Sequence, residues 1–272
     1  MHAHGKEGMD MNRRSFAQAV GSAAILSALS KASPRSESES ASAGKIMAVA
    51  AHPGDGLFTM GALLAQQAGR GGAAVLVNLS LGERGAPKNT PVKLYGEMQR
   101  TATEKAARLL GIDAVFLDYP DGQIPCNEES ALRVCDAIRG HKPDIVVTHW
   151  KGSWHKDHRN CHRIVRDAVF FAGLETLERS RAAHSVSKVF YADNWEDADR
   201  FVADTYIDVD PVYEKWLRAC DFYPMWRGQT GFFRYNDYYG SLSVMRGCLS
   251  GFKHAVALMT DGSQRAQRLQ LL

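Results

Sequence analysis

The amino-acid sequence predicts an α/β fold: a Rossmann-like, doubly wound, mostly parallel sheet flanked by helices. Short apolar runs of strand length alternate with longer segments in which apolar residues recur at helical spacing. The first run, residues 46–51, leads into a cluster of turn residues, Pro53-Gly54-Asp55-Gly56, and then into a helical pattern. This strand–turn–helix order is the unit from which parallel sheets are built.

The elements follow in order along the chain. The parallel core is predicted to contain strands at residues 46–51, 73–79, 113–118 and 144–150, with helices at residues 57–70, 97–110, 128–140 and 158–177, and a further strand is predicted at residues 188–192. The last third predicts an edge strand at residues 201–209 and helices at residues 211–220 and 238–251. Residues 222–235 are aromatic and interrupted by Gly and Pro, which predicts a loop that can wall a cleft.

Residues 1–44 predict an export signal and a linker ahead of the folded domain. An Asn-Arg-Arg-Ser-Phe motif at residues 12–16 precedes an apolar run at residues 17–29, a pattern typical of a bacterial twin-arginine (Tat) signal. The alternative is a disordered basic tail. The apolar run is shorter than the roughly 20 residues that span a membrane, so no stable membrane span is expected after export. The folded domain is placed at residues 45–260, a polar tail at residues 261–272, and the protein in the periplasm or outside the cell.

The composition and the absence of certain motifs argue against several kinds of binding partner. The chain has 272 residues, 45% hydrophobic and 23% charged, with a net charge of +3 and no basic block, so nucleic acid is not expected as a partner. The five cysteines include no C-x-x-C pair, which argues against a cysteine-based zinc site. No G-x-G-x-x-G motif follows the first strand, so a dinucleotide is not predicted. A small-molecule substrate is the remaining expectation.

Two strand ends carry residues that suit a metal ion. His52 and Asp55 follow the first strand, and His158 follows the strand at residues 144–150. The carboxyl ends of parallel strands meet at one edge of the sheet, where open α/β sheets bind ligands. Two imidazoles and one carboxylate with open positions suit a catalytic Zn²⁺, with Fe²⁺ as the alternative. The plainer interpretation is a turn Asp at a helix start and a buried structural His.

Both stretches resemble motifs of the PIG-L/LmbE-like family of metal-dependent N-acetylglucosamine deacetylases. The family's Ala-His-Pro-Asp-Asp-Glu motif corresponds to Ala51-His52-Pro53-Gly54-Asp55-Gly56, and its His-Pro-Asp-His motif corresponds to His155-Lys156-Asp157-His158. The resemblance runs over residues 45–258 and includes Gly82-Glu83, Arg100-x-x-x-Glu104 and Tyr119-Pro-Asp121-Gly122.

The resemblance implies a role for several residues. His52, Asp55 and His158 would bind the metal, and His155 would stabilise the oxyanion of the tetrahedral intermediate. Arg100 would reach toward the substrate, although an exposed ion pair with Glu104 is the plainer interpretation. His254 lies where the family has its Gly-x-x-Tyr-Ala-Glu-Ala-Phe segment, so it is expected at the edge of the site.

One departure from the family motif affects the expected chemistry. The family's general base is the first Asp of its motif, and this chain has Gly54 there. Loss of a general base typically costs about 10²–10⁴ in rate. Three outcomes remain open: Asp157 or Glu83 replaces the base, the reaction is slow, or the site binds without turnover.

Two further residues are candidates for contact with a sugar. Asp121 can accept hydrogen bonds from sugar hydroxyls or simply form the turn that Asp-Gly favours. Trp154 can lie against the apolar face of a sugar ring or pack its own loop. The sequence therefore predicts a metal-dependent hydrolase that removes an acetyl or other acyl group from an N-acylated amino sugar or related amide. The alternative functions are a non-catalytic, metal-containing, sugar-binding protein and a structural domain without metal.

Overall fold

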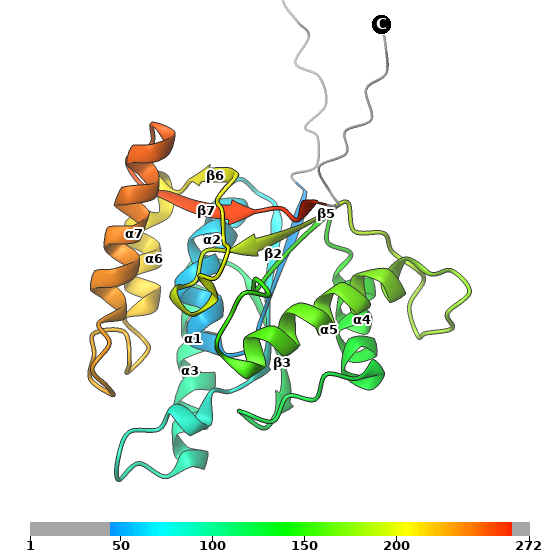
Figure 1. Cartoon of the computed structure of the whole chain (residues 1–272), viewed down its shortest axis with the longest axis horizontal. Coiled ribbons are helices and arrows are strands. Elements are labelled where there is room, and N and C mark those ends of the chain that lie inside the picture. The colour runs from blue at the N-terminus through cyan, green and yellow to red at the C-terminus, as the bar shows by residue number, and fades with distance from the viewer. Residues whose placement is uncertain (1–43, 263–272) are drawn as a thin grey trace, which may run out of the picture. The chain divides into compact units, whose positions relative to one another are not determined.

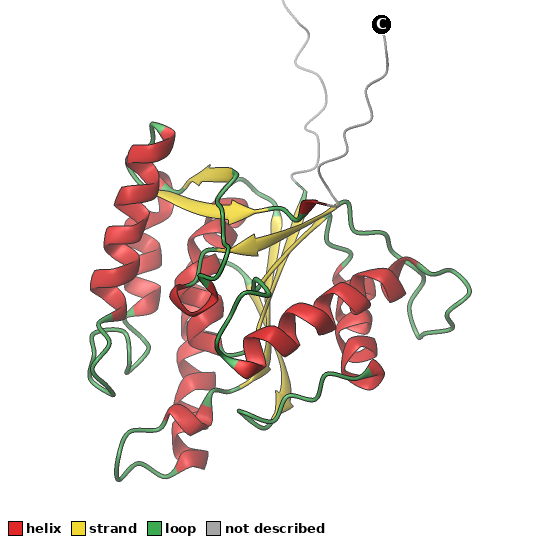
Figure 2. Ribbon diagram, viewed as in Figure 1, coloured by secondary structure: helices red, strands yellow, loops and turns green. Residues whose placement is uncertain are grey.

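The computed structural model describes residues 44–262, which form a seven-stranded sheet with helices on both faces (Figures 1 and 2). The predicted export signal and most of the predicted polar tail lie outside the described residues. The strands are β1 (Lys45–Ala50), β2 (Ala73–Ser80), β3 (Asp113–Tyr119), β4 (Ile145–Thr148), β5 (Lys188–Ala192), β6 (Thr205–Asp208) and β7 (Ala255–Met259). Within residues 44–262, no helix has both the length and the apolar character that a bilayer crossing requires.

The strand order is β3-β2-β1-β4-β5-β7-β6. The strands from β3 to β5 pair in parallel, whereas β7 runs antiparallel to both β5 and β6. The predicted α/β fold with a mostly parallel sheet is confirmed. Since β1 lies between β2 and β4, the chain changes its direction of travel across the sheet at the β1/β4 pair. A crevice beyond the carboxyl ends of such a pair is where these sheets bind ligands.

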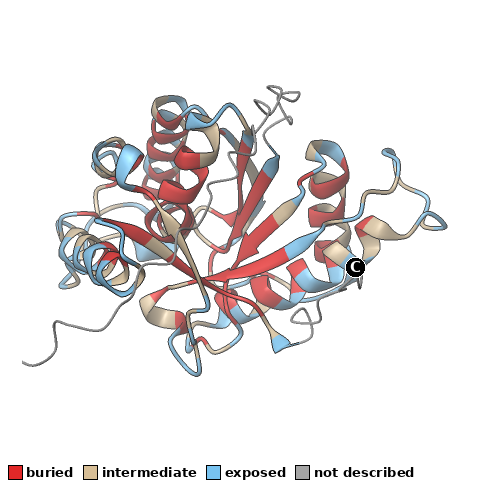
Figure 3. Cartoon of the chain, turned by 90° about the horizontal axis from the view of Figure 1, so that it is seen from above, coloured by how far each residue is buried: buried red, intermediate tan, exposed pale blue. Residues whose placement is uncertain are grey.

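Helices cover the two faces of the sheet through two separate apolar cores. Ile46, Ala48 and Ala50 point to the core shared with α2 (Gly61–Gly69), α3 (Val92–Leu110) and α6 (Tyr213–Cys220). Met47 and Val49 point to the core shared with α4 (Glu128–His141) and α5 (Lys156–Gly173). Side chains alternate along a strand, so a strand buried on both faces is apolar throughout. Figure 3 shows the strands at the centre of the sheet as mostly buried, whereas β6 is only partly buried. The helices are α1 (Pro53–Asp55), α2 (Gly61–Gly69), α3 (Val92–Leu110), α4 (Glu128–His141), α5 (Lys156–Gly173), α6 (Tyr213–Cys220) and α7 (Tyr235–Ser250).

The structure differs from the sequence prediction mainly near the chain end. Strand β7 was not predicted, because a short apolar run after a helix cannot be assigned by periodicity alone. Its insertion beside β5 moves the predicted edge strand, now β6, one place outward. The helices α3 and α7 also begin before their predicted first residues, at Val92 and Tyr235. A π-helical turn, Gly56–Met60, joins α1 to α2.

Candidate metal centre

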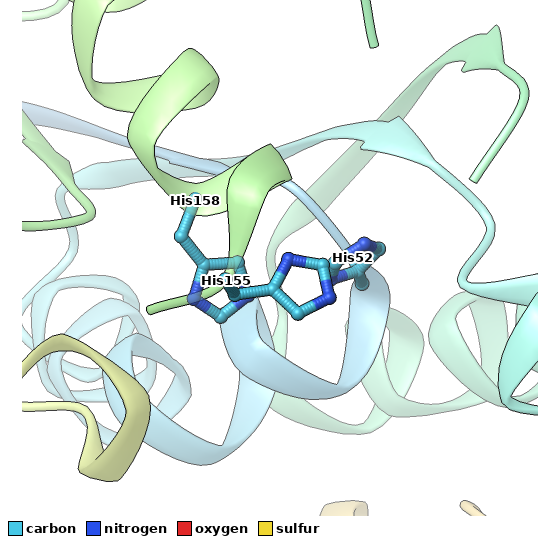
Figure 4. Close-up of side chains that lie close together, drawn as sticks. All are labelled: His52, His155 and His158. Carbon is cyan, nitrogen blue, oxygen red and sulfur yellow. The ribbon is translucent and has the colours of Figure 1, made fainter. Parts of the chain in front are cut away.

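The three predicted metal ligands lie at the sheet edge where β1 and β4 end. His52 precedes α1 with an extended backbone, and Asp55 is the last residue of α1. His158 lies in the first turn of α5. Figure 4 shows the imidazole rings of His52 and His158 directed toward the same region, with the ring of His155 close to both. Two loops from adjacent strands therefore bring these side chains together.

One oxygen of Asp55 contacts both imidazoles. Asp55 Oδ2 lies 2.8 Å from His52 Nδ1 and 3.0 Å from His158 Nε2. The other oxygen, Oδ1, accepts a hydrogen bond from the Asn194 side chain at 3.3 Å. The two imidazole nitrogens and the carboxylate thus converge from separate segments of the chain.

A buried carboxylate fixes the orientation of His158. Asp197 accepts a hydrogen bond from His158 Nδ1 through Oδ1 and from His149 Nδ1 through Oδ2, each at 2.8 Å. His149 Nε2 in turn accepts a hydrogen bond from the backbone N–H of Ala51 at 3.1 Å. All three side chains are almost completely buried. Because Asp197 accepts the hydrogen bond from Nδ1–H, the Nε2 atom of His158 is directed at Asp55.

Two other carboxylates surround the far nitrogen of His52. His52 Nε2 lies 3.0 Å from Asp121 Oδ1 and 3.6 Å from Asp157 Oδ2. Backbone amides hold both acids, since Gly122 N donates to Asp157 Oδ2 at 2.6 Å and Arg84 N donates to Asp121 Oδ2 at 2.9 Å. Each imidazole therefore has Asp55 on one side and a further carboxylate on the other.

These contacts shift the pKa values of the cluster. Burial by itself would lower the pKa of His158, but Asp55 and Asp197 outweigh it and raise that pKa to about 10. The pKa of His52 also rises despite burial, because Asp121, Asp157 and Asp55 favour its charged form. Burial opposes ionisation of Asp55, yet His158 and His52 hold its pKa well below the usual value. The cluster therefore stabilises positive charge next to Asp55.

Side chains in this cluster could hold a metal ion. Among the described residues, the sets whose ligand atoms lie close enough to share one ion are His52 with His155 and His158, Asp55 with His149 and His158, and His52 with Asp121 and Asp157. The three predicted ligands belong to these sets but do not form one of them by themselves. Metal-binding histidines almost always have a carboxylate or carbonyl at their other ring nitrogen. Both His52 and His158 have one, in Asp121 and Asp197.

The cluster borders a cavity of about 370 Å³. Of the predicted site residues, His52, Asp55, Asp121 and His155 line it. Its wall also includes residues that the sequence did not single out as site residues, among them Phe58, Arg84, Gln99, Glu196, Met225 and Tyr235.

His155 has a defined tautomer. It precedes α5, and its Nδ1 accepts a hydrogen bond from the backbone N–H of Asp157 at 3.2 Å. The proton of the neutral ring is therefore on Nε2. Its ring stacks on that of His158 with centroids 4.5 Å apart. Burial and the positive charges of His158 and His52 lower the pKa of His155 to about 4, so the ring is neutral near pH 7.

Apolar side chains lie next to Gly54, the residue that the sequence resemblance aligns with the expected general base. A Cβ atom at Gly54 would lie 3.2 Å from Met225 Cε and 3.3 Å from Phe58 Cε2. Gln99 Nε2 donates a hydrogen bond to Met225 Sδ at 3.4 Å, which holds the thioether in place. The wall of the cavity at Gly54 is therefore apolar.

The two predicted replacement bases lie outside the cavity wall. Asp157 is fully buried, and it packs between His52 and the backbone of Gly122. Glu83 Oε1 accepts a hydrogen bond from the backbone N–H of Asp121 at 2.8 Å. Both carboxylates hold the loops around His52, and the structure places neither on the cavity surface.

The remaining predicted substrate residues also lie off the cavity wall. Arg100 pairs with Asp118 and lies over the Phe116 ring, with Cζ 4.2 Å from its centroid. His254 stacks on Tyr213 and pairs with Asp210 at 2.6 Å. Trp154 is 63% exposed and contacts the ring of His155, which does line the cavity.

The loop after β5 supplies the residues that sequence reasoning missed. Asn194, Glu196 and Asp197 all lie in it. Glu196 lines the cavity, and its Oε2 lies 3.4 Å from His158 Nε2. Burial, with a further contribution from the charge of Asp55, raises the pKa of Glu196 to about 7. The sequence shows three acids and one Asn among residues 193–197, directly after a predicted strand, which indicates a loop at the sheet edge but not which of its side chains reaches the cavity.

Comparisons with known proteins agree with this fold. Residues 47–169 match the PIG-L family, described as GlcNAc-PI de-N-acetylase. The chain is 25% identical over 211 residues to 4-oxalmesaconate hydratase from Pseudomonas putida, covering 74% of this chain and 79% of the relative. It is also 25% identical over 224 residues to diacetylchitobiose deacetylase from Thermococcus kodakarensis, covering 78% of this chain and 80% of the relative.

The fold comparison extends to solved structures. The 4-carboxy-2-hydroxymuconate hydratase from Pseudomonas putida KT2440 superposes with a TM-score of 0.74 at 21% identity, over 84% of this chain and all of that chain. The strand order, the paired motifs at the ends of β1 and β4 and the family match agree with one another. Residues 47–169 therefore match the PIG-L family, and the chain is similar over most of its length to a deacetylase named with that activity.

Proposed function

We propose that this protein is a metal-dependent hydrolase that removes an acetyl or other acyl group from an N-acylated amino sugar or a related amide. The observation that carries the proposal is the contact of His52 Nδ1 and His158 Nε2 with the same oxygen of Asp55 beside the cavity. The likeness to a diacetylchitobiose deacetylase supports an amide substrate on a sugar.

Three residues would bind the cation, and neighbouring residues orient them or contact the substrate. His52, Asp55 and His158 would hold the cation, and Asp121 and Asp197 orient the two imidazoles. A bound Zn²⁺ or Fe²⁺ would polarise the amide carbonyl and lower the pKa of water to about 7. The Nε2–H of His155 is free to donate a hydrogen bond to the carbonyl oxygen as negative charge develops on it.

Glu196 is the carboxylate best placed to accept a proton. Among the described residues, the carboxylates on the cavity wall are those of Asp55, Asp121 and Glu196. Asp55 is shared by two imidazoles, and Asp121 is held by Arg84 N and faces His52. Glu196 can take a proton from the attacking water as the C–O bond forms. It can then return that proton to the nitrogen as the C–N bond breaks, so the amine leaves neutral.

The test is amine release from a panel of N-acyl sugars, together with the metal content of the purified protein. We expect turnover in the wild type, about 10²–10⁴ less in Glu196→Gln, and smaller effects in Glu83→Gln. Asp157→Asn should weaken metal binding through His52 as well as lower the rate. If Glu196→Gln keeps full activity and Glu83→Gln loses it, the proton acceptor is Glu83.

Two other functions have specific support. The first is metal-containing sugar binding without turnover, which Gly54 supports because the usual base is missing. The second is addition of water to a carbon–carbon double bond, which the similarity to a hydratase supports. Sugar binding without amine release would favour the first. Hydration of an unsaturated carboxylic acid, with no amine release from any sugar, would favour the second.

We also propose export through the twin-arginine motif at residues 12–16. Cell fractionation of a bacterial host that expresses the full chain tests this proposal. Replacing both arginines, Arg13→Lys with Arg14→Lys, should keep the protein in the cytoplasm. Equal partition of the variant and the wild type would rule the signal out.

A further inference from the structure

The outward face of helix α7 is made of apolar and small side chains. Figure 1 shows α7 at the outer edge of the described fold. From Tyr238 to Ser250, the exposed positions of this helix are all uncharged: Tyr238, Ser241, Val244, Met245, Cys248 and Leu249. A helix at the surface normally presents charged or polar residues to water, and a helix that is apolar on all sides is usually a buried one. The outward face of α7 therefore has the character of a covered surface.

The charged residue in the middle of α7 is directed away from this face. Arg246 Nη2 lies 2.7 Å from the carboxylate of Asp193, which follows β5. Tyr239 is buried, and its hydroxyl donates a hydrogen bond to Asn194 Oδ1 at 3.3 Å. The inner face of α7 is thus anchored to the fold, and its outward face is held in one orientation. A surface that is fixed in advance loses little conformational entropy when a partner covers it.

The outward face is hollow at one end and carries exposed apolar side chains at the other. The first half of α7 borders a surface groove of about 590 Å³, whose lining includes Tyr238, Ser241 and Met245. Beyond the groove, Leu249 is 63% exposed and Phe252 is 41% exposed. A groove and two large apolar side chains therefore follow one another along the same helix.

Each end of this face carries one cation and one carboxylate. Arg234 Nε lies 2.8 Å from Asp237 Oδ2 at the start of α7, and Lys253 Nζ lies 3.9 Å from Asp210 Oδ1 just past its end. An anionic membrane or a nucleic acid attracts surfaces with an excess of Lys and Arg, and this face has no such excess. An apolar centre with a charged, accessible rim is typical of an interface between proteins.

We propose that α7 is a dimerisation surface, on which the same helix of a second copy of this chain packs in antiparallel orientation. A two-fold interface uses one patch twice, so the patch must be complementary to itself. With the axis near Met245, Leu249 and Phe252 of each copy face the groove of the other. The same arrangement brings Lys253 of one copy near Asp237 of the other. A parallel pair would instead set groove against groove and would place like charges together.

The mass of the full chain in solution, measured by analytical ultracentrifugation, tests this interface. The wild type should sediment as a dimer of the 30.0 kDa chain. Met245→Lys and Met245→Glu each place two like charges at the axis, so each should raise the dissociation constant of the dimer at least about 100-fold. An equimolar mixture of the two variants should restore the dimer, because opposite charges then face each other.

Phe170→Lys is the matched control for the added charge. Phe170 is 62% exposed on α5, so the substitution puts the same charge at an exposed apolar position on another helix. This variant should dimerise like the wild type. Equal dissociation of Phe170→Lys and Met245→Lys would mean that charge alone, rather than its place on α7, separates the copies, and it would overturn the proposal.

Thiol labelling locates the surface independently of the mass. Cys248 lies on the outward face of α7, whereas Cys126 precedes α4, and both are exposed in the single chain. At a concentration about 100 times the dissociation constant, the wild type should react with a maleimide at Cys248 roughly tenfold more slowly than Met245→Lys does, because few chains are then monomeric. Cys126 should react equally in both. Dilution of the wild type should also expose Cys248, so this measurement does not depend on the folding of a variant.

Two results would overturn the proposal. One is a dimer that persists in Met245→Lys while Cys248 reacts as fast as Cys126, which would place the interface on another surface. The other is a wild type that is monomeric at every concentration. If Cys248 were still protected in that monomer, the outward face would be covered by residues of the same chain outside 44–262.

Discussion

Asp197 Oδ1 accepts a hydrogen bond from His158 Nδ1 at 2.8 Å, in a part of the protein where both side chains are fully buried. The opposite oxygen of Asp197 is occupied by His149, so this carboxylate cannot turn away. The direction in which His158 Nε2 points is thus set by the hydrogen bond that the opposite ring nitrogen, Nδ1, donates to Asp197. Residues that never touch a substrate therefore determine the geometry of the candidate metal centre.

Replacing Asp197 should mainly lower the affinity of the site for its metal ion. In Asp197→Asn, the amide cannot act as an acceptor to both histidines, so His158 loses its fixed tautomer. Loss of such a supporting carboxylate typically costs about 10–100-fold in metal affinity. Competition with a chromophoric chelator measures this. Asp199→Asn, an exposed neighbour, is the control and should bind metal like the wild type.

The base position can be restored in a variant. Glu196→Gln should be nearly inactive; adding Gly54→Asp puts a carboxylate back where the family has one. The new side chain needs room, because its Cβ would lie 3.2 Å from Met225 Cε, so Met225→Ala is included. We expect the triple variant to recover at least about tenfold in kcat over Glu196→Gln, a fraction of the usual contribution of a general base.

A second triple variant controls for the extra space. Glu196→Gln with Gly54→Ala and Met225→Ala has the same cavity changes without the carboxylate, and it should remain inactive. Equal recovery in both triple variants would mean that the larger cavity left by Met225→Ala, rather than the new carboxylate, restores the rate. No recovery in either, with metal content unchanged, would argue that Glu196 does not act as the proton acceptor.

The sequence predicted the fold class and brought three candidate ligands to one sheet edge, because strand periodicity and turn residues are local signals. It could not predict Glu196 as a wall residue, since nothing local distinguishes that carboxylate from Asp157 or Glu83. Whether each carboxylate points into the cavity or away from it depends on contacts with residues distant in the sequence. Asp157 is turned inward by the amide of Gly122, and Glu83 is held by the amide of Asp121.

The position of His254 illustrates the same limit. Its place near the chain end suggested an edge of the site, but the unpredicted strand β7 begins at the next residue. The ring stacks on Tyr213 at 3.6 Å and bonds to Asp210, away from the cavity wall. An antiparallel strand inserted between β5 and β6 cannot be inferred from spacing, since it depends on pairing between segments about 50 residues apart.

Acid should destabilise the protein partly through His162. Burial, together with the charges of Arg166 and Lys151, lowers the pKa of His162 to about 4, although a hydrogen bond to His149 O opposes the shift. The unfolded chain binds a proton near pH 6.5 and the folded chain does not, so stability falls as pH drops from 6.5 toward 4. The total effect is about 3 kcal/mol, from a shift of about 2.5 pKa units at 1.36 kcal/mol each.

Urea unfolding at several pH values measures this contribution. His162→Asn keeps a side-chain N–H donor near His149 O but has no group that titrates. The difference in unfolding free energy between wild type and variant should therefore change with pH between 6.5 and 4 and stay constant between 7 and 8. A constant difference across the whole range would show that His162 is not neutral in the folded protein.

Arg139 should be among the residues on which stability depends most. Its guanidinium is 1% exposed and donates five hydrogen bonds to backbone carbonyls at the end of α5 and in the loop beyond it, those of Phe171, Ala172, Leu174, Leu177 and Arg181. Arg139→Met keeps much of the volume but leaves several buried acceptors without a donor, at about 1–3 kcal/mol each. We expect a loss of at least about 3 kcal/mol in urea unfolding. Arg133→Met, which removes a single bond to Leu117 O, should cost about 1 kcal/mol. Similar losses in the two variants would mean that the carbonyls around Arg139 find other donors.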